Sequence, residues 1–130
     1  MFYTLLVDES VGFRHALSDV LHAYFPLIDV EETGDVTEAQ SMVEYLRPNI
    51  VLMDIQLPEG CGLEISKEIR QIYNDIVMVI LTNNNQPEYR QQALRDGTDY
   101  CISKREESCM EKILTRIEGV LDSRMTCSPQ

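Results

Sequence analysis

One stretch decides the fold, Asn49-Ile50-Val51-Leu52-Met53-Asp54-Ile55-Gln56-Leu57-Pro58-Glu59-Gly60-Cys61-Gly62-Leu63-Glu64. Four apolar residues run directly into Asp54, and a loop rich in proline and glycine then leads into a helical pattern. A short apolar run bounded by turn residues predicts a strand that is buried on both faces. Open α/β sheets bind their ligands outside the carboxyl ends of the strands. The pattern therefore predicts that Asp54 lies at such an end, close to a helix N-terminus, where it can meet an anion or a metal.

Length and composition indicate one globular domain. A chain of 130 residues can bury one hydrophobic core, and 44% hydrophobic and 25% charged residues are ordinary for such a protein. No apolar run approaches the roughly 20 residues that span a bilayer. The apolar segment at residues 2–7 lacks the basic residues that precede a signal sequence. We expect a domain over residues 1–122 and a flexible C-terminal tail over residues 123–130.

Charge and cysteine usage narrow the classes of partner. The net charge of −11 argues against binding to nucleic acid, which selects clustered Lys and Arg, and against binding to anionic membrane surfaces. Four cysteines, at positions 61, 101, 109 and 127, have neither the spacing of a metal site nor the density of a disulfide scaffold. We therefore expect a cytoplasmic protein that contacts neither nucleic acid nor membrane.

Strand patterns alternate with helix patterns along the whole chain. Strands are predicted at residues 2–7, 27–30, 50–54, 76–81 and 100–102. Apolar stripes at helical spacing follow each strand and end near Pro26, Pro48, Asn74, Gly97 and Leu121. Ser10 and Thr37 are the candidate N-caps of the first two helices. Right-handed crossovers turn this order into a doubly wound α/β fold, a flavodoxin-like five-stranded parallel sheet of order 2-1-3-4-5 with five helices.

Polar residues fall at the carboxyl ends of four strands of this predicted sheet: Asp8 with Glu9, then Asp54, Thr82 and Lys104. Three carboxylates in one crevice repel each other unless they share a cation or take up protons. Hard oxygen ligands with open coordination positions suit Mg²⁺. A hydroxyl and an ammonium on the far side would complete a pocket of phosphoryl size, because Lys binds phosphate oxygens as a compact charge. Each residue alone has an ordinary structural explanation, but their common placement favours a site.

The same motifs resemble the receiver domain of bacterial two-component response regulators, and in particular stand-alone receivers of the chemotaxis-regulator type. The resemblance covers about residues 2–121. The matching pieces are Leu-Leu-Val-Asp8-Glu9, Leu-Met-Asp54-Ile-Gln-Leu-Pro58 with Gly62-Leu63-Glu64, Ile-Leu-Thr82, and Gly97 followed by Ser-Lys104.

The resemblance implies that Asp54 accepts a phosphoryl group from a sensor histidine kinase or a phosphotransfer protein. It implies a Mg²⁺ ion held by Asp8, Glu9, Asp54 and the backbone carbonyl of Gln56, with Thr82 and Lys104 on the phosphoryl oxygens. Such a domain catalyses only its own phosphorylation and dephosphorylation. It switches the face made by its fourth helix, fifth strand and fifth helix for a downstream protein. The sequence identifies neither the kinase nor the downstream target. It also leaves the oligomeric state undetermined, and a homodimer is one of the alternatives.

Three positions depart from the receiver pattern, and one of them, Glu9 in place of a second aspartate, is a common variation. Receivers usually have proline after the lysine, where this chain has Arg105. The switch aromatic normally lies three residues before the lysine, and that position is Cys101. Tyr100 is one residue earlier, so its side chain should point to the opposite face of the strand. The predicted switch positions are therefore Thr82, Cys101 and Tyr100.

Three other functions compete with this interpretation. The first is an interaction module with a receiver fold that works without phosphorylation, and the intact acidic, hydroxyl and lysine positions argue against it. The second is a Mg²⁺-dependent phosphohydrolase of the haloacid-dehalogenase type, which needs an aspartate where this chain has Gln56. The third is a flavodoxin-like cofactor binder, whose phosphate would be repelled by Asp8-Glu9-Ser10 after the first strand.

Overall fold

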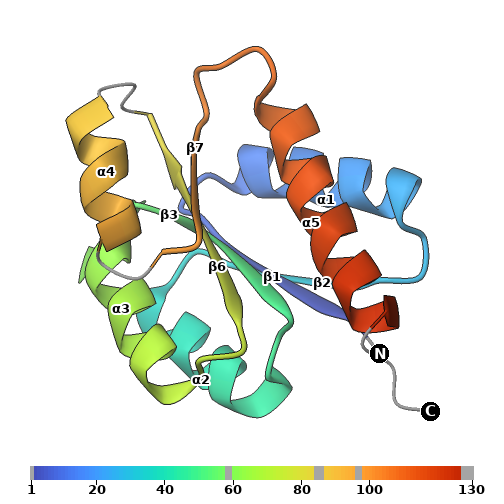
Figure 1. Ribbon diagram of the computed structural model, residues 1–130, viewed down its shortest axis with the longest axis horizontal. Coiled ribbons are helices and arrows are strands. Elements are labelled where there is room, and N and C mark those ends of the chain that lie inside the picture. Colours follow the sequence, from blue (N-terminus) through green and yellow to red (C-terminus); the bar gives the residue numbers. More distant parts are fainter. Residues whose placement is uncertain (1, 58–59, 84–86, 96–97, 127–130) are drawn as a thin grey trace.

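The main sheet holds five parallel strands in the order β2-β1-β3-β6-β7. The computed structural model describes residues 2–57, 60–83, 87–95 and 98–126. The strands of this sheet are β1 (Tyr3–Val7), β2 (Asp29–Thr33), β3 (Ile50–Asp54), β6 (Val77–Thr82) and β7 (Tyr100–Ser103). Counted along the chain, this is the order 2-1-3-4-5, so the predicted sheet is confirmed (Figure 1).

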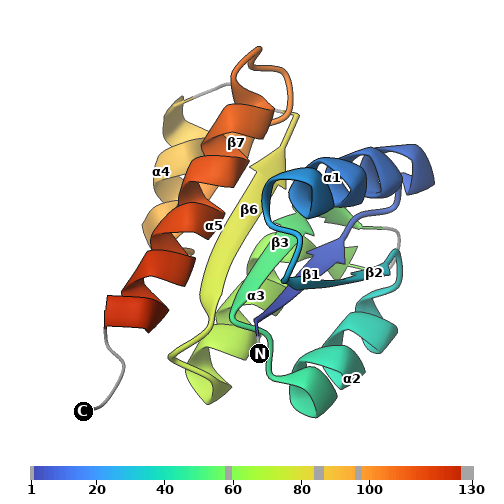
Figure 2. The same ribbon diagram turned by 90° about the vertical axis from the view of Figure 1, so that its right-hand side faces the viewer.

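Helices cover both faces of the sheet. One face carries α1 (Val11–Tyr24) and α5 (Cys109–Thr126), and the other carries α2 (Val36–Leu46), α3 (Gly62–Ile72) and α4 (Pro87–Arg95) (Figures 1 and 2). The predicted flavodoxin-like doubly wound architecture is therefore confirmed. In the part of the chain that the structure describes, no helix is long and apolar enough to cross a membrane.

Three local features differ from the sequence expectations. Leu27, predicted to lie in the second strand, is 93% exposed, and the ladder begins at Asp29, whose N–H donates to the carbonyl of Phe2 at 2.8 Å. The N-cap of α2 is Asp35, whose side chain accepts a hydrogen bond from the amide of Thr37, so the prediction of Thr37 as the cap is wrong. The expected loop after β3 contains a short hairpin of β4 (Gln56–Leu57) and β5 (Gly60–Cys61).

The C-terminal boundary also has a different local structure from the one expected. Helix α5 continues through Thr126, past the expected domain end at residue 122. Residues 127–130 of the expected tail lie outside the described residues, as do Pro58 and Gly97 of the receiver motifs. The prediction of a flexible tail therefore stays a prediction for residues 127–130.

The N-cap expected for α1 is present. Ser10 precedes the helix, and its hydroxyl accepts a hydrogen bond from the amide of Phe13 at 3.2 Å. This bond satisfies one of the N–H groups that the first turn of a helix leaves without an intrahelical partner. The cap therefore fixes where α1 starts, directly after the carboxyl end of β1.

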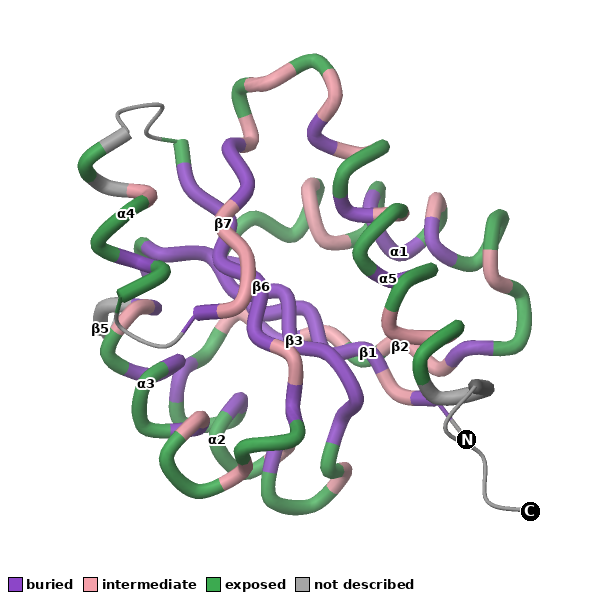
Figure 3. The backbone as a smooth tube through the Cα atoms, viewed as in Figure 1, coloured by how far each residue is buried: buried purple, intermediate pink, exposed green. Residues whose placement is uncertain are grey.

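The central strand β3 is buried along its whole length (Figure 3). Successive side chains of a strand point to opposite faces. Accordingly Val51 and Met53 pack with α2 and α3, whereas Ile50 and Leu52 pack with α1 and α5. Full burial of one such side chain is worth about 1.5–3 kcal/mol. Asp54 thus ends a strand that is held firmly from both sides.

Thr4 is the exception within this core. It lies on β1 with no exposed surface, and among the described residues its hydroxyl is the buried side-chain polar atom without a hydrogen-bond partner. A buried polar group without a partner costs about 1–3 kcal/mol. Thr4→Val keeps the shape and removes the hydroxyl, so we expect it to stabilise the fold by about 1 kcal/mol. Urea unfolding measures this as a higher midpoint at unchanged slope.

Thr33→Val is the matched control for this change. Thr33 is equally buried, but its hydroxyl accepts a hydrogen bond from the amide of Asp35 at 3.1 Å. Removing this acceptor leaves the Asp35 amide without its partner, so the control should lower the midpoint. A lower midpoint for Thr4→Val as well would contradict the account of the Thr4 hydroxyl.

Candidate functional site

The carboxyl ends of neighbouring strands bring the predicted site residues together. Asp8 follows β1, Asp54 ends β3, Thr82 ends β6 and Lys104 follows β7. The strands are in register there, because Val7 pairs with Met53, Asp54 with Leu81 and Thr82 with Ser103. Asp8, Asp54 and Thr82 are buried, with exposed fractions of 2%, 8% and 2%. The backbone amide of Lys104 donates to the carbonyl of Thr82 at 2.7 Å.

The ammonium of Lys104 lies between two buried carboxylates. Its Nζ contacts Oδ2 of Asp8 and lies 3.3 Å from Oδ2 of Asp54. The ring of Phe13, from the first turn of α1, has its centroid 4.4 Å from the same Nζ. An ammonium against an aromatic face gains further attraction. Lys104 therefore offsets the repulsion between two acids that share one end of the sheet.

Two contacts hold the Asp54 carboxylate. Oδ1 accepts a hydrogen bond from the amide of Gln56 at 3.2 Å, and Oδ2 faces Lys104. Burial raises the pKa of Asp54 above its usual value, and Asp8 raises it further, although the Gln56 amide and the Lys104 ammonium act in the opposite direction. The ionised carboxylate is thus incompletely compensated, and an additional cation would stabilise it.

Gly62 permits the close approach of α3 to the backbone at Asp54. Its amide donates to the carbonyl of Ile55 at 2.7 Å, and a Cβ at this position would lie 2.3 Å from the carbonyl oxygen of Asp54. Any side chain would therefore displace the backbone at the end of β3. The sequence shows this glycine as part of a receiver motif, and the structure gives it this steric role.

The arrangement partly matches the expected metal site. Asp8 and Asp54 converge on one positive charge, whereas the side chain of Glu9 is exposed. Within residues 2–57, 60–83, 87–95 and 98–126, no three His, Cys, Asp or Glu side chains gather where they could hold a metal. Two converging carboxylates are nonetheless the hard oxygen donors that Mg²⁺ prefers, so the donor chemistry fits this ion. The roles of Glu9 and of the Gln56 carbonyl stay predictions.

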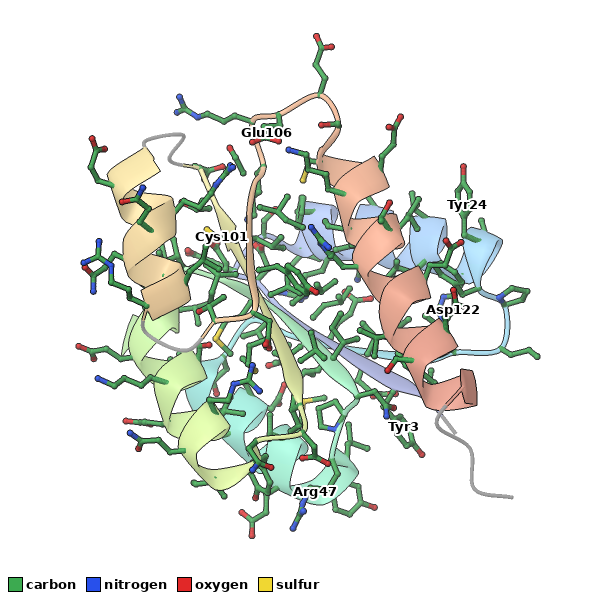
Figure 4. The ribbon with its side chains drawn as sticks, viewed as in Figure 1. Tyr3, Tyr24, Arg47, Cys101, Glu106 and Asp122 are labelled. Atoms are coloured by element: carbon green, nitrogen blue, oxygen red, sulfur yellow. The ribbon has the colours of Figure 1, made fainter. Side chains whose placement is uncertain are left out.

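Two of the predicted switch residues, Cys101 and Tyr100, lie on opposite faces of β7. Cys101 packs against the core under α2 and α3, on the α4 side of the strand (Figure 4). Tyr100 packs against the core under α1 and α5. The guanidinium of Arg116 on α5 lies 3.9 Å from the centroid of the Tyr100 ring. Burial raises the pKa of the Cys101 thiol, so the thiol is neutral at physiological pH. The alternation expected for these two residues is confirmed.

A pocket of about 540 Å³ lies over β7 between α4 and α5. Arg90, Leu94, Cys101, Lys112 and Arg116 are among its lining residues. Glu106, in the loop between β7 and α5 (Figure 4), joins the two helices across this pocket. Its carboxylate accepts a hydrogen bond from Arg90 on α4 at 2.8 Å and contacts the ammonium of Lys112 on α5. This bridge leaves no signal in the sequence, because its members lie in three separate segments.

Comparison with known proteins identifies the class of this chain. The family model for the response regulator receiver domain matches residues 4–118, so the chain belongs to this family. Receiver domains are signalling domains of two-component systems, not classical enzymes, and they interact with histidine kinases or phosphotransfer proteins and with downstream targets.

Individual relatives agree with this assignment. The chain is 33% identical over 100 residues to the chemotaxis protein CheY of Halobacterium salinarum, covering 77% of this chain and 82% of that protein. It is 32% identical over 104 residues to the DNA-binding transcriptional activator DevR/DosR of Mycobacterium tuberculosis, covering 80% of this chain and 48% of that protein. The chain thus spans about half the length of that DNA-binding relative.

The fold agrees equally well with solved receiver structures. A CheY-like receiver domain protein from Methanospirillum hungatei superimposes with a TM-score of 0.83 at 22% identity, over 98% of this chain and 99% of that one.

Because one relative binds DNA, the expectation that this chain contacts no nucleic acid stays a prediction.

Glu106→Gln should weaken the ion pairs that link α4 and α5. Hydrogen bonds from Lys112 and Arg90 lower the pKa of Glu106 below its usual value of 4.5. The stabilisation is therefore fully present above that value and is lost as the pH falls through the depressed pKa of the folded state. At pH 7 we expect a loss of about 0.5 kcal/mol, the size of a partly exposed ion pair, and a smaller loss at pH 3.

Urea unfolding of the variant and the parent at the two pH values measures this difference. Glu107→Gln is the matched control, since Glu107 is the exposed neighbour in the same loop. An equal loss in both variants, or a loss that does not depend on pH, would show that the bridge contributes nothing specific.

Proposed function

We propose that this chain is a phosphorylation-dependent receiver in which Asp54 accepts a phosphoryl group from a sensor histidine kinase or a phosphotransfer protein. The observation that carries the proposal is the environment of the Asp54 carboxylate. Asp54 ends a strand buried on both faces, and one of its carboxylate oxygens accepts a hydrogen bond from the Gln56 amide. Its other oxygen lies beside the ammonium that it shares with Asp8.

Transfer to a carboxylate needs alignment and neutralisation of charge more than covalent help. A carboxylate oxygen of Asp54 forms the new bond to phosphorus while the bond from phosphorus to the donor nitrogen or oxygen breaks. The donor leaves with that electron pair. The Gln56 amide orients the carboxylate, Lys104 supplies positive charge, and the Thr82 hydroxyl at the next strand end is the proposed donor to a phosphoryl oxygen.

The residues proposed to hold Mg²⁺ are Asp8, Glu9 and Asp54 through their carboxylates and Gln56 through its backbone carbonyl. When bound, the ion neutralises negative charge on the carboxylates and on the phosphoryl group. Asp8 and Asp54 already face a common cation, which supports this assignment. Self-catalysed dephosphorylation at the same site and a cytoplasmic location complete the proposal.

The partner-binding face is proposed to be the surface of α4, β7 and α5. A phosphoryl group adds about −1.5 to −2 charges next to Lys104. The backbone of Lys104 is hydrogen-bonded to Thr82, and two residues further on Glu106 contacts Arg90 on α4. A shift at Lys104 can therefore change the balance between two positions of α4, whose buried contact with the rest of the molecule includes Ala93. The downstream target is a protein of unidentified chemistry.

A receiver-like interaction module that acts without phosphorylation is the second candidate. The observation that favours it is the pair of departures at Cys101 and Arg105 on the switch face. The two candidates differ in one property, the dependence of target binding on the chemistry of Asp54.

Incubation with acetyl phosphate and Mg²⁺ followed by intact-mass measurement tests the proposal. The parent protein should gain one phosphoryl group, and Asp54→Asn should gain none, because the amide cannot act as the nucleophile. Chelation of Mg²⁺ should abolish the adduct. Asp19→Asn, an exposed change on α1, is the matched control and should behave as the parent does.

Two outcomes would count against this assignment. A full adduct on Asp54→Asn would show that another residue is the acceptor. A parent protein that takes up no phosphoryl group from either acetyl phosphate or a phosphorylated histidine donor would favour the interaction module.

A further inference from the structure

The side chain of Arg14, on α1, contacts the site at the main-chain carbonyl of Asp8. Its Nη1 donates a hydrogen bond to the main-chain carbonyl of Asp8, and its Nε donates to Oε1 of Glu32 on β2 at 3.3 Å. The side chain of Arg14 is only 13% exposed. One guanidinium therefore links the carboxyl end of β1 to the neighbouring edge strand.

The chain leaves room for this guanidinium at Gly34, which follows β2. A Cβ on Gly34 would lie 2.9 Å from Nη1 of Arg14 and 3.3 Å from the carbonyl oxygen of Asp8. The amide of Asp8 donates to the carbonyl of Thr33 at 3.0 Å. The main chain at Asp8 is thus held on its N–H side by β2 and on its carbonyl side by Arg14.

The direction of the Asp8 carboxylate depends on this backbone. Oδ1 accepts a hydrogen bond from the amide of Ser10 at 2.8 Å, and Oδ2 contacts the ammonium of Lys104. A change in ψ at Asp8, which turns this carbonyl, would displace the Ser10 amide relative to the Asp8 carboxylate and so weaken the bond that holds its Oδ1. We infer that Arg14 is a positioning residue, which holds the carbonyl of Asp8 and thereby aims the Asp8 carboxylate at the cation that it shares with Asp54.

A simple ion pair between α1 and β2 would need only one positive charge near Glu32. The contacts of Arg14 use two different nitrogens of one planar group, on a carbonyl and on a carboxylate. A lysine presents a single ammonium and cannot span both acceptors in this geometry. Partners that orient metal-binding side chains commonly change metal affinity by about 10- to 100-fold. The consequence for Mg²⁺ binding rests on the proposed function, whereas the effect on Asp8 itself does not.

The first test reads the orientation of Asp8 directly, in metal-free protein. NMR measures hydrogen exchange of the Ser10 amide in the parent and in Arg14→Met. We expect exchange at Ser10 to be about tenfold faster in the variant, since its bond to the Asp8 carboxylate weakens. Exchange at Gln56, whose amide is bonded to Asp54, should stay the same. A general loss of structure would instead raise the exchange rates of both amides together.

The control and two further variants sharpen this test. His15→Ala removes the neighbour on α1 that lies 3.7 Å from the same Glu32, and it should leave exchange at Ser10 unchanged. Arg14→Lys should fall between the parent and Arg14→Met. Gly34→Ala keeps the arginine but crowds its guanidinium, so it should change Ser10 in the same direction. If Arg14→Met does not fold, the exchange rate of the Ser10 amide in Arg14→Lys and in Gly34→Ala provides the same test.

The second readout is the Mg²⁺ dissociation constant from NMR titration of the unphosphorylated protein. It should rise about tenfold in Arg14→Met and stay at the parent value in His15→Ala. Parent-like exchange at Ser10 in folded Arg14 variants would overturn the inference, whatever the phosphorylation result. A responsive Ser10 amide in a chain that accepts no phosphoryl group would instead refute the proposed function and leave the positioning role intact.

Discussion

The rest of the site depends on one interaction, the ammonium of Lys104 between the carboxylates of Asp8 and Asp54. Charges taken out of water are tolerated only when they are paired. The acids come from β1 and β3 and the ammonium follows β7, so the group assembles only when the strands are correctly registered. A slip by one residue would turn each of these side chains to the opposite face of the sheet.

The same balance supports the proposal of phosphoryl chemistry at this end of the sheet. Two carboxylates share one ammonium, and burial raises the pKa of Asp54 despite that partner. The group therefore still favours added positive charge and is sensitive to added negative charge. Lys104 is bound through its backbone to Thr82, and the next residues lead to the Glu106 bridge between α4 and α5. Chemistry at Asp54 and the shape of the pocket over β7 thus lie on one chain of contacts.

Much of this arrangement follows from local sequence pattern. The apolar runs that form β3 and β6 are unbroken, and parallel strands bring their ends to one edge whatever the details of the helices. Contacts between distant segments could not be predicted, such as Arg14 on the Asp8 carbonyl or Phe13 under Lys104. Adjacent residues also diverge at the end of a strand. Asp8 turns into the site whereas Glu9 is exposed, and composition alone does not distinguish the two.

Carbon-13 NMR titration of the side-chain carboxyls in metal-free protein tests the central claim most directly. The parent should show a pKa of Asp54 above the usual value of 3.8, because burial and Asp8 together outweigh the groups that lower it. Lys104→Met should raise that pKa further, since it removes the ammonium that stabilises the ionised form. A pKa of Asp54 at or below 3.8, or the same pKa in the parent and the variant, would contradict the account of a carboxylate pair that depends on Lys104.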